Sequence, residues 1–273
     1  MPSSWTDLDR PPLSAARIER AVRSTGLWRE VQVVESTGST NADVAAAARG
    51  GAAEGLVRIA EAQDLGRGRL DRAWQSPARA GILMSVLLRP DMPASALPLV
   101  PLLVGVAVVE AVRAVGDVAA TLKWPNDVLV GEHKLAGILV ERVDGAVVVG
   151  LGLNVSTHRD ELPVPTSTSL ALAGGRTDRE PLAKELLRAL ARRYLAFGAS
   201  GGASAAVLPA YREVCGTIGR VVSVELPGGG VSSGTATAVD DTGMLVVVEE
   251  DGREQHWSAG DVVHLRTEQD AEG

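Results

Sequence analysis

The sequence predicts an α+β fold, in which helices flank a central mixed or antiparallel β-sheet and a small β-barrel follows. Helical and strand-like segments are interleaved up to residue 215. Between residues 119 and 150, four short apolar stretches follow one another with turn residues between them, as in antiparallel hairpins. After Ile218, valine-rich strands are separated by tight glycine turns, which is typical of a small barrel.

The expected helices begin or end at recognisable residues. A helix over Leu13–Thr25 ends at Gly26, which adopts a left-handed cap without strain. Ser39 or Thr40 starts a short alanine-rich helix. The stretch Pro98–Val115 is apolar on nearly all sides and is expected to be a central helix. Two further helices are expected over Glu180–Phe197 and Ala203–Val214.

The expected strands are apolar or β-branched runs bounded by turn residues, and the Asp144-Gly145 pair between two of them is a strong hairpin signal. They span Val31–Glu35, Leu56–Glu61, Gly81–Leu88, Ala119–Lys123, Asp127–Val130, Leu135–Arg142 and Ala146–Gly150. A domain boundary is expected near Cys215–Thr217. Residues 1–215 then form the larger domain, residues 216–266 the barrel, and residues 267–273 a disordered tail.

The composition bounds the kind of protein that the chain forms. Its 273 residues, 45% of them hydrophobic, suffice for one large domain with its own core and a small second domain. A formal net charge of -7 argues against nucleic-acid binding through a broad positive field, so any anion site must be local. The single cysteine, Cys215, excludes an intrachain disulfide and is interpreted as an idle or structural thiol.

The sequence also predicts a cytoplasmic protein without a membrane anchor. The first thirty residues lack the apolar core of a signal peptide. The stretch from Met92 to Val109 carries no charge, but Pro93, Pro98 and Pro101 interrupt it. We therefore expect a buried helix there.

An arginine–glycine segment, Gly66-Arg67-Gly68-Arg69-Leu70-Asp71-Arg72, precedes Trp74 in this acidic chain. Each guanidinium group offers a fork of donors suited to phosphate or carboxylate, and each glycine lets the backbone approach a ligand closely. The composition indicates an anion site, although a solvated basic turn explains the segment equally well by itself.

Two other polar segments allow both a structural and a functional interpretation. The segment Lys123-Trp124-Pro125-Asn126-Asp127 holds a cation, an amide and a carboxylate together, but its last two residues are also ordinary turn formers. The segment Gly38-Ser39-Thr40-Asn41 precedes a helix, where hydroxyl residues are usually caps and where polar head groups also bind. The four histidines are scattered, which argues against a histidine metal site.

Taken together and in order, these segments resemble the bacterial biotin–protein ligase family. The matching segments are Ser39-Thr40-Asn41, Gln63 with the arginine–glycine segment and Trp74, Lys123-Trp124-Pro125-Asn126-Asp127, Lys134-Leu135-Ala136-Gly137-Ile138 and Gly152-Leu153-Asn154. The resemblance runs from about Val33 to Asn154, and the C-terminal barrel matches the family too. It implies a biotin/lipoyl ligase-like catalytic domain with an SH3-like barrel, in a short form without an N-terminal DNA-binding domain.

The resemblance implies an enzyme that joins biotin to ATP and then transfers the biotinyl group from biotinyl-5′-AMP to a lysine. The acceptor would be the biotin carboxyl carrier domain of an acyl-CoA carboxylase. Cationic side chains and Mg²⁺ would offset the repulsion between the carboxylate and the α-phosphate. A mobile lid, Leu65–Arg72, would cover the adenylate, although Leu70-Asp71 departs from the family pattern and places an acid among the arginines.

By the same resemblance, individual residues receive roles. The catalytic residues are Lys123, Arg67, Arg69 and Asp127, with Asp127 also as the metal ligand. The biotin-binding residues are Ser39, Thr40, Asn41, Gln63, Arg67, Gly68, Arg69, Lys134 and Gly137. The nucleotide-binding residues are Arg69, Arg72, Trp74, Lys123, Asn126 and Asn154.

Two alternatives remain open, a lipoate–protein ligase of the related fold and a non-catalytic biotin-binding or interaction protein. Lipoyl and octanoyl transferases depend on a catalytic cysteine, whereas Cys215 lies outside the matching segments. Thirty-eight residues precede Ser39, too few for the winged helix of family members that repress transcription, so we expect no DNA binding. The sequence does not show which carboxylase is the acceptor or which oligomeric state the protein adopts.

Overall fold

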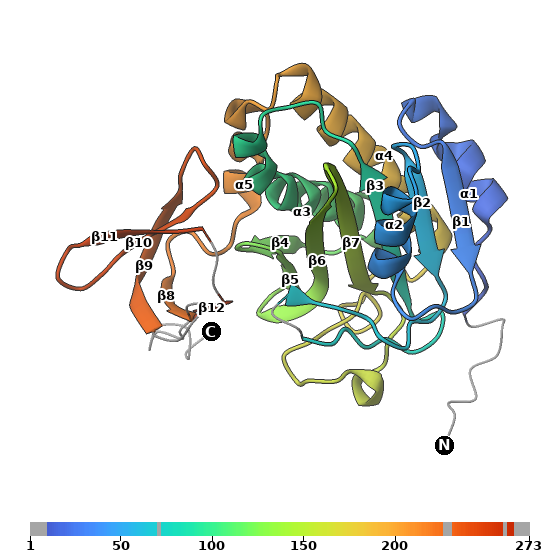
Figure 1. Ribbon diagram of the computed structural model, residues 1–273. Helices are drawn as coiled ribbons and strands as arrows, with labels where there is room; N and C mark the ends of the chain where they lie inside the picture. Colours follow the sequence, from blue (N-terminus) through green and yellow to red (C-terminus); the bar gives the residue numbers. More distant parts are fainter. Residues whose placement is uncertain (1–9, 70–71, 226–230, 259–260, 265–273) are drawn as a thin grey trace.

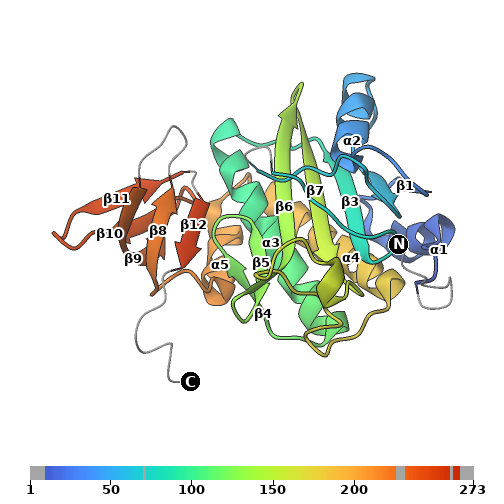
Figure 2. The same cartoon turned by 90° about the horizontal axis from the view of Figure 1, so that it is seen from below.

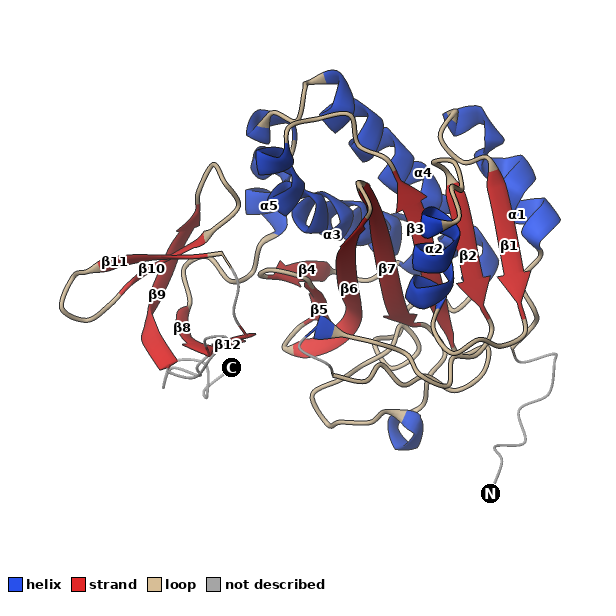
Figure 3. Cartoon of the chain, in the orientation of Figure 1, coloured by secondary structure: helices blue, strands red, loops and turns tan. Residues whose placement is uncertain are grey.

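The computed structural model describes residues 10–69, 72–225, 231–258 and 261–264. Within these residues, the chain forms a seven-stranded sheet with helices on both faces and a separate five-stranded antiparallel sheet (Figures 1 and 3). This arrangement confirms the predicted α+β fold with a small C-terminal β-rich part. The predicted tail over 267–273 and the unusual pair Leu70-Asp71 lie outside the described residues.

The large sheet has the strand order β1-β2-β3-β7-β6-β5-β4. It is mixed because β1 and β2 pair in parallel, while every other neighbouring pair is antiparallel. Its strands are β1 (Glu30–Val34), β2 (Leu56–Ala60), β3 (Gly81–Leu88), β4 (Ala120–Lys123), β5 (Asp127–Val130), β6 (His133–Val143) and β7 (Ala146–Asn154). The two longest strands, β6 and β7, lie near the middle of the sheet.

Helices cover the two faces of this sheet unequally. One face carries α2 (Thr40–Arg49) alone, and the other carries α1 (Ala15–Val22), α3 (Val100–Ala111) and α4 (Arg179–Ala199) (Figures 1 and 2). The larger core lies on the three-helix side, whereas α2 packs through Val44 and Ala48 on a small cluster with Leu87 and Val148. Because α2 is short, the sheet next to its N-terminus stays open for a site.

The apolar segment Ala94–Gly116 has the length and hydropathy of a membrane span, but 72% of its most apolar window is buried inside the protein. Helix α3 belongs to this segment and packs against the sheet, α4 and α5 (Leu208–Val214). Its uniform apolarity follows from contacts on several sides, as predicted for a core helix.

Several predicted elements differ in their bounds from the observed ones, among them the strand that forms β7 and the helix over Ala203–Val214. Strand β7 continues past Gly150 to Asn154, because residues 151–154 stay paired with β3 on one side and β6 on the other over most of their length. The predicted helix over Ala203–Val214 is an α-helix only from Leu208, where a proline in the first turn favours its start. The first correction matters for function, since it places Gly152 inside the sheet together with Gly150.

The C-terminal sheet has the order β11-β10-β9-β8-β12 and packs beside the β4 edge of the large sheet (Figure 2). Its strands are β8 (Val221–Glu225), β9 (Val231–Val239), β10 (Leu245–Val248), β11 (Glu254–Trp257) and β12 (Asp261–His264). The connection from α5 joins the two parts directly, because Gly216 N donates to the Leu122 carbonyl at 2.8 Å. Trp124 Nε1 also donates to the Gly243 carbonyl at 3.0 Å.

Candidate functional site

The first turn of α2 forms one end of a cavity above the large sheet. Ser39 is the N-cap, as predicted, and its side chain accepts from Ala42 N at 3.4 Å. Thr40 and Asn41 follow in the first turn, and both are buried. Gln63, just after β2, places its Oε1 atom 2.7 Å from Thr40 N and 3.0 Å from Thr40 Oγ1. The side chains of Ser39, Thr40, Asn41 and Gln63 are polar and uncharged, and this end of the cavity is called the head of α2 below.

The floor of the cavity is a tryptophan that lies on two glycines. Gly137 of β6 and Gly152 of β7 are direct cross-strand partners. A Cβ atom on Gly152 would overlap the indole ring of Trp74, and one on Gly137 would lie 3.1 Å from that ring. The ring can lie flat on the sheet only because both positions lack a side chain. Its Nε1 atom is buried and has no hydrogen-bond partner among the described residues.

The opposite end of the cavity is cationic. Lys134 of β6 places its Nζ atom 2.7 Å from Asp127 Oδ1 and 5.8 Å from the centroid of the Trp74 ring. Arg69 donates from Nη1 to Asn126 Oδ1 at 2.9 Å, and Asn126 Nδ2 donates in turn to the Ile138 carbonyl at 2.9 Å. A lysine and an arginine are therefore held at the far side of the floor from α2, where they would attract an anionic group.

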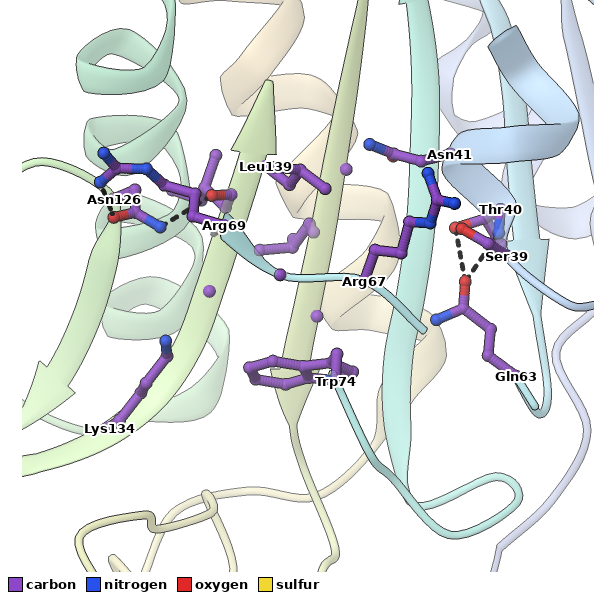
Figure 4. A pocket seen from close by; sticks show the side chains of 16 residues that line it. Ser39, Thr40, Asn41, Gln63, Arg67, Arg69, Trp74, Asn126, Lys134 and Leu139 are labelled. Atoms are coloured by element: carbon purple, nitrogen blue, oxygen red, sulfur yellow. Dashed lines mark hydrogen bonds between the residues drawn. The ribbon is translucent and has the colours of Figure 1, made fainter. Parts of the chain in front are cut away.

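Figure 4 shows how the cavity connects these parts, with the head of α2 at one end, Trp74 between, and Lys134 with Arg69 at the other. Arg67 extends from the arginine–glycine segment toward α2. Sixteen of the described residues line the cavity: Ser39, Thr40, Asn41, Gln63, Arg67, Gly68, Arg69, Trp74, Asn126, Lys134, Gly137, Ile138, Leu139, Gly150, Leu151 and Gly152. The structure thus brings together residues from all five of the matching segments.

All nine residues predicted to bind biotin line this cavity, as do Arg69, Trp74 and Asn126 of the predicted nucleotide set. Residues 138–139 and 150–152 also line it and were absent from the prediction. A signal for the last group was present in the sequence, since Gly150 and Gly152 alternate with leucines and so share one face of a strand. The mistaken end of β7 at Gly150 concealed it.

Four predicted site residues lie outside the lining of the cavity. Asp127 is joined to it through its ion pair with Lys134. Asn154 is buried and donates to the Thr168 carbonyl at 2.9 Å. Arg72 lines a neighbouring hollow on the other side of the arginine–glycine segment, together with Leu65. The fourth, Lys123, is the partner of Asp127 across β4 and β5.

Lys123 lies near the C-terminal sheet. Burial lowers the pKa of His264 in β12 to about 4, and the positive charges of Lys123 and Arg220 act in the same direction. Thr217 joins the same region, since its Oγ1 atom accepts from Trp124 N at 3.0 Å and lies 3.0 Å from His264 Nε2. The C-terminal sheet therefore contacts the turn that carries Lys123 and Asn126.

Cys215 takes no part in the cavity. Its side chain is buried between α5 and β4, and burial raises the pKa of the thiol above its usual value. A raised pKa favours the unreactive protonated form. The structure therefore agrees with an idle thiol and gives no support to a cysteine-dependent acyl transferase.

Comparison with protein families identifies two matching models. The model of the biotin/lipoate A/B protein ligase family matches residues 33–157, and that of the biotin protein ligase C-terminal domain matches residues 217–265. The first match contains every residue that lines the cavity, and the second contains the C-terminal sheet.

Individual biotin protein ligases are also similar to this chain over most of its length. The chain is 43% identical to the biotin–[acetyl-CoA-carboxylase] ligase of Mycobacterium tuberculosis, over 96% of this chain and 100% of that protein. It is 31% identical to the bifunctional ligase/repressor BirA of Bacillus spizizenii, over 90% of this chain and 78% of that protein. Among solved structures, the biotin protein ligase of Aquifex aeolicus in complex with biotin and ATP aligns with a TM-score of 0.73 and 26% identity, over 86% of this chain and 98% of that one.

Proposed function

Because this chain belongs to the biotin protein ligase family, we infer that it activates biotin with ATP and transfers the biotinyl group to a lysine of a biotin carboxyl carrier domain. One observation carries the inference for this site: the cavity joins the uncharged side chains at the head of α2, with Arg67 beside them, to a cationic end at Lys134 and Arg69 across an apolar floor. Biotin has the same order of groups, namely a cyclic urea, an apolar body and a carboxylate.

Chemistry then sets the direction in which biotin lies. The urea group needs hydrogen-bond partners without net charge, which the head of α2 and Gln63 supply. The thiophane ring and the alkyl chain pack over Trp74 and its two glycines. The carboxylate then reaches the cationic end, where the α-phosphate of ATP must also bind for the two to react.

Bringing a carboxylate to a phosphate requires fixed positive charge, because the two groups repel each other. Lys134 lines the cavity and supplies such a charge, while its ion pair with Asp127 and its position over Trp74 limit its motion. We therefore assign the neutralising role to Lys134, together with Arg69 at the same end of the cavity. The predicted roles of Lys123 in catalysis and of Arg72 and Asn154 in nucleotide binding stay predictions.

Mg²⁺ enters this reaction with ATP. Among the described residues, no group of three His, Cys, Asp or Glu side chains could hold a metal ion. Asp127 offers a carboxylate, but Lys134 already engages one of its oxygens at 2.7 Å. The side chains present thus do not fit a complete magnesium site, whereas MgATP brings phosphate and water ligands of its own. A contact between Asp127 and the ion stays a prediction.

The transfer step needs an acceptor lysine, whose uncharged amine attacks the carbonyl carbon of biotinyl-5′-AMP and releases AMP. A carrier domain of an acyl-CoA carboxylase is the acceptor that we propose. The C-terminal sheet contacts the turn around Trp124, and this contact supports the proposal that the sheet takes part in receiving the carrier domain. We further propose a cytoplasmic enzyme that does not bind DNA, and a gel-shift assay with operator-like DNA at low salt tests the second point.

Pyrophosphate release tests the activation step and separates the alternatives. The purified protein is supplied with MgATP and either biotin or lipoate. Release that depends on biotin supports the proposed function. Pyrophosphate release that depends on lipoate would show that the protein is a lipoate ligase. No pyrophosphate release with either acid would favour a binding protein without catalytic activity.

A further inference from the structure

The hydrogen bonds at the head of α2 extend past the cavity to two residues that do not line it. Asn41 donates from Nδ2 to Glu141 Oε2 at 2.7 Å, and Glu141 is half-buried on β6. On its other side, Asn41 Oδ1 lies 2.6 Å from the hydroxyl of Ser85 on β3. The Ser85 hydroxyl is also 2.7 Å from Thr40 Oγ1, and Ser85 is fully buried. Glu141 and Thr40 are thus the two ends of a continuous chain of contacts.

Glu141 fixes one end of this chain of contacts, and Gln63 fixes the other. A carboxylate accepts hydrogen bonds and has no proton to give. It therefore fixes the Asn41 amide with its nitrogen toward Glu141 and its oxygen toward Ser85. The amide oxygen carries no proton, and neither does Gln63 Oε1, which accepts from the backbone N–H of Thr40. The two hydroxyl protons of Ser85 and Thr40 must therefore serve three contacts, of 2.6 Å from Ser85 to Asn41, 2.7 Å between the hydroxyls and 3.0 Å from Thr40 to Gln63. The two shortest contacts take the two protons, so Ser85 donates to Asn41.

Thr40 then has only one way to bond with Ser85. Since the proton of Ser85 points toward Asn41, the contact of 2.7 Å between the two hydroxyls uses the proton of Thr40. Gln63 Oε1 lies 3.0 Å from Thr40 Oγ1 and already receives the backbone N–H of Thr40. Both oxygens therefore present lone pairs, and no proton is left to fill the space between them.

We propose that Glu141 and Ser85 are positioning residues that make Thr40 a hydrogen-bond acceptor and so adapt the head of α2 to a ligand N–H group. Under the function proposed above, on which this inference rests, that group is a ring N–H of the cyclic urea of biotin. A ligand with an acceptor in the same place would meet two further acceptors and be rejected.

The packing around Asn41 supports this role, because its amide group occupies the space that Gly150 leaves open. A Cβ atom on Gly150 of β7 would overlap Asn41 Oδ1. Gly150 and Ser85 are direct partners across β7 and β3. The pairing therefore puts the Ser85 hydroxyl next to the space that the Asn41 amide occupies. Three strands, β3, β6 and β7, thus fix the orientation of the Asn41 amide. That orientation decides whether the Thr40 hydroxyl accepts a hydrogen bond from a ligand.

The test is the ability of the full-length protein to distinguish biotin from biotin methylated at the urea nitrogens. Calorimetry gives the two Kd values for the wild type and for Glu141→Leu, which removes the acceptor. The Leu variant should bind biotin on the order of tenfold more weakly, since the Asn41 amide can then reverse. In this variant, the ratio of the Kd for methylated biotin to the Kd for biotin should fall toward one. Arg142→Leu, at an exposed position next to Glu141 on the same strand, is the matched control and should keep the wild-type ratio.

A mutant cycle separates this chain of contacts from a general effect on folding. In a Thr40→Val background the acceptor is gone, so adding Glu141→Leu should change the biotin Kd by less than about twofold. An equal loss in both backgrounds, or an unchanged ratio in Glu141→Leu, overturns the proposal. Should Glu141→Leu fail to fold, Ser85→Ala breaks the same chain and should lower the ratio likewise. If the wild type itself does not bind biotin, the proposed function fails instead.

Discussion

At the scale of single residues, the cavity depends on glycines as much as on charged side chains. Gly137 and Gly152 leave room for the Trp74 ring, and Gly150 leaves room for the Asn41 amide. A methyl group at any of these positions would displace a side chain that lines the cavity. None of the three has a positive φ, so their role is close approach and not backbone conformation.

We expect Gly152→Ala to abolish most biotin activation while leaving the fold intact. The added methyl group would overlap the indole of Trp74, so the floor of the cavity could not form. Biotin-dependent pyrophosphate release should fall at least about tenfold, with little change in Tm. Gly198→Ala is the control, because a Cβ there meets open space on helix α4 and should leave the rate unchanged. A normal rate in Gly152→Ala would show that Trp74 does not form the floor.

The two lysines of the matching segments should differ in importance. Lys134 lines the cavity and Lys123 does not, so Lys134→Ala should lower the rate of pyrophosphate release about a hundredfold or more. Lys123→Ala should have a clearly smaller effect on this step. Comparison of single-turnover rates at saturating biotin and MgATP measures the difference, and a larger loss in Lys123→Ala would restore the catalytic role first predicted for it.

At the scale of elements, a buried ion pair fixes α4 to the large sheet. Arg179 in the first turn of α4 and Glu61 after β2 approach to 2.6 Å, and both side chains are less than 5% exposed. Glu61 Oε1 also accepts from Leu13 N at 2.6 Å, and Arg179 donates to the Pro11 and Gly81 carbonyls. One pair thereby joins the N-terminal segment, two strand ends and a helix.

Removing one partner of this pair should destabilise the protein strongly. Arg179→Met leaves the Glu61 carboxylate buried without its cation, which typically costs about 3–5 kcal/mol of unfolding free energy. The double variant Glu61→Gln/Arg179→Met should be more stable than the single one, because the amide still accepts from Leu13 N. Urea unfolding of both variants measures their free energies of unfolding. A loss below about 1 kcal/mol in Arg179→Met would mean that water reaches the carboxylate.

At the scale of the whole molecule, the two sheets meet at Thr217 and Trp124. Thr217 is fully buried, accepts from the backbone of Trp124 and lies within hydrogen-bonding distance of His264. Arg212 of α5 strengthens the junction by donating to the Val239 carbonyl of β9. Through these contacts, the C-terminal sheet supports the turn between β4 and β5 that carries Asn126.

The junction should weaken in mild acid. The pKa of His264 lies near 4 in the folded protein and near 6.5 when the chain is unfolded. The folded state favours the neutral ring, so this stabilisation is complete above pH 6.5 and is lost as the pH falls toward 4. The loss is at most about 3 kcal/mol. Unfolding free energies between pH 7 and 4.5 should therefore fall more steeply for the wild type than for His264→Gln. Parallel curves would contradict the prediction.

The sequence allowed much of this architecture to be predicted because its local signals agree with the fold. The Ser39 cap, the strand over 81–88 and the hairpin at Asp144-Gly145 all form where local signals placed them. The end of β7 was missed, since cross-strand pairing with β3 overrides the weak strand propensity of glycine. Spacing alone could not show that Lys134 reaches the cavity while Lys123 does not, because this depends on the register in which β4 and β6 pair with β5 between them.

The most direct test of the central claim is detection of the intermediate itself. The full-length protein is mixed with MgATP and biotin in the absence of any acceptor, and the quenched mixture is separated and identified by mass spectrometry. The proposed function predicts biotinyl-5′-AMP in an amount close to that of the enzyme, and much less of it with Lys134→Ala. Pyrophosphate release without this mixed anhydride, or no biotin-dependent product at all, would contradict the account.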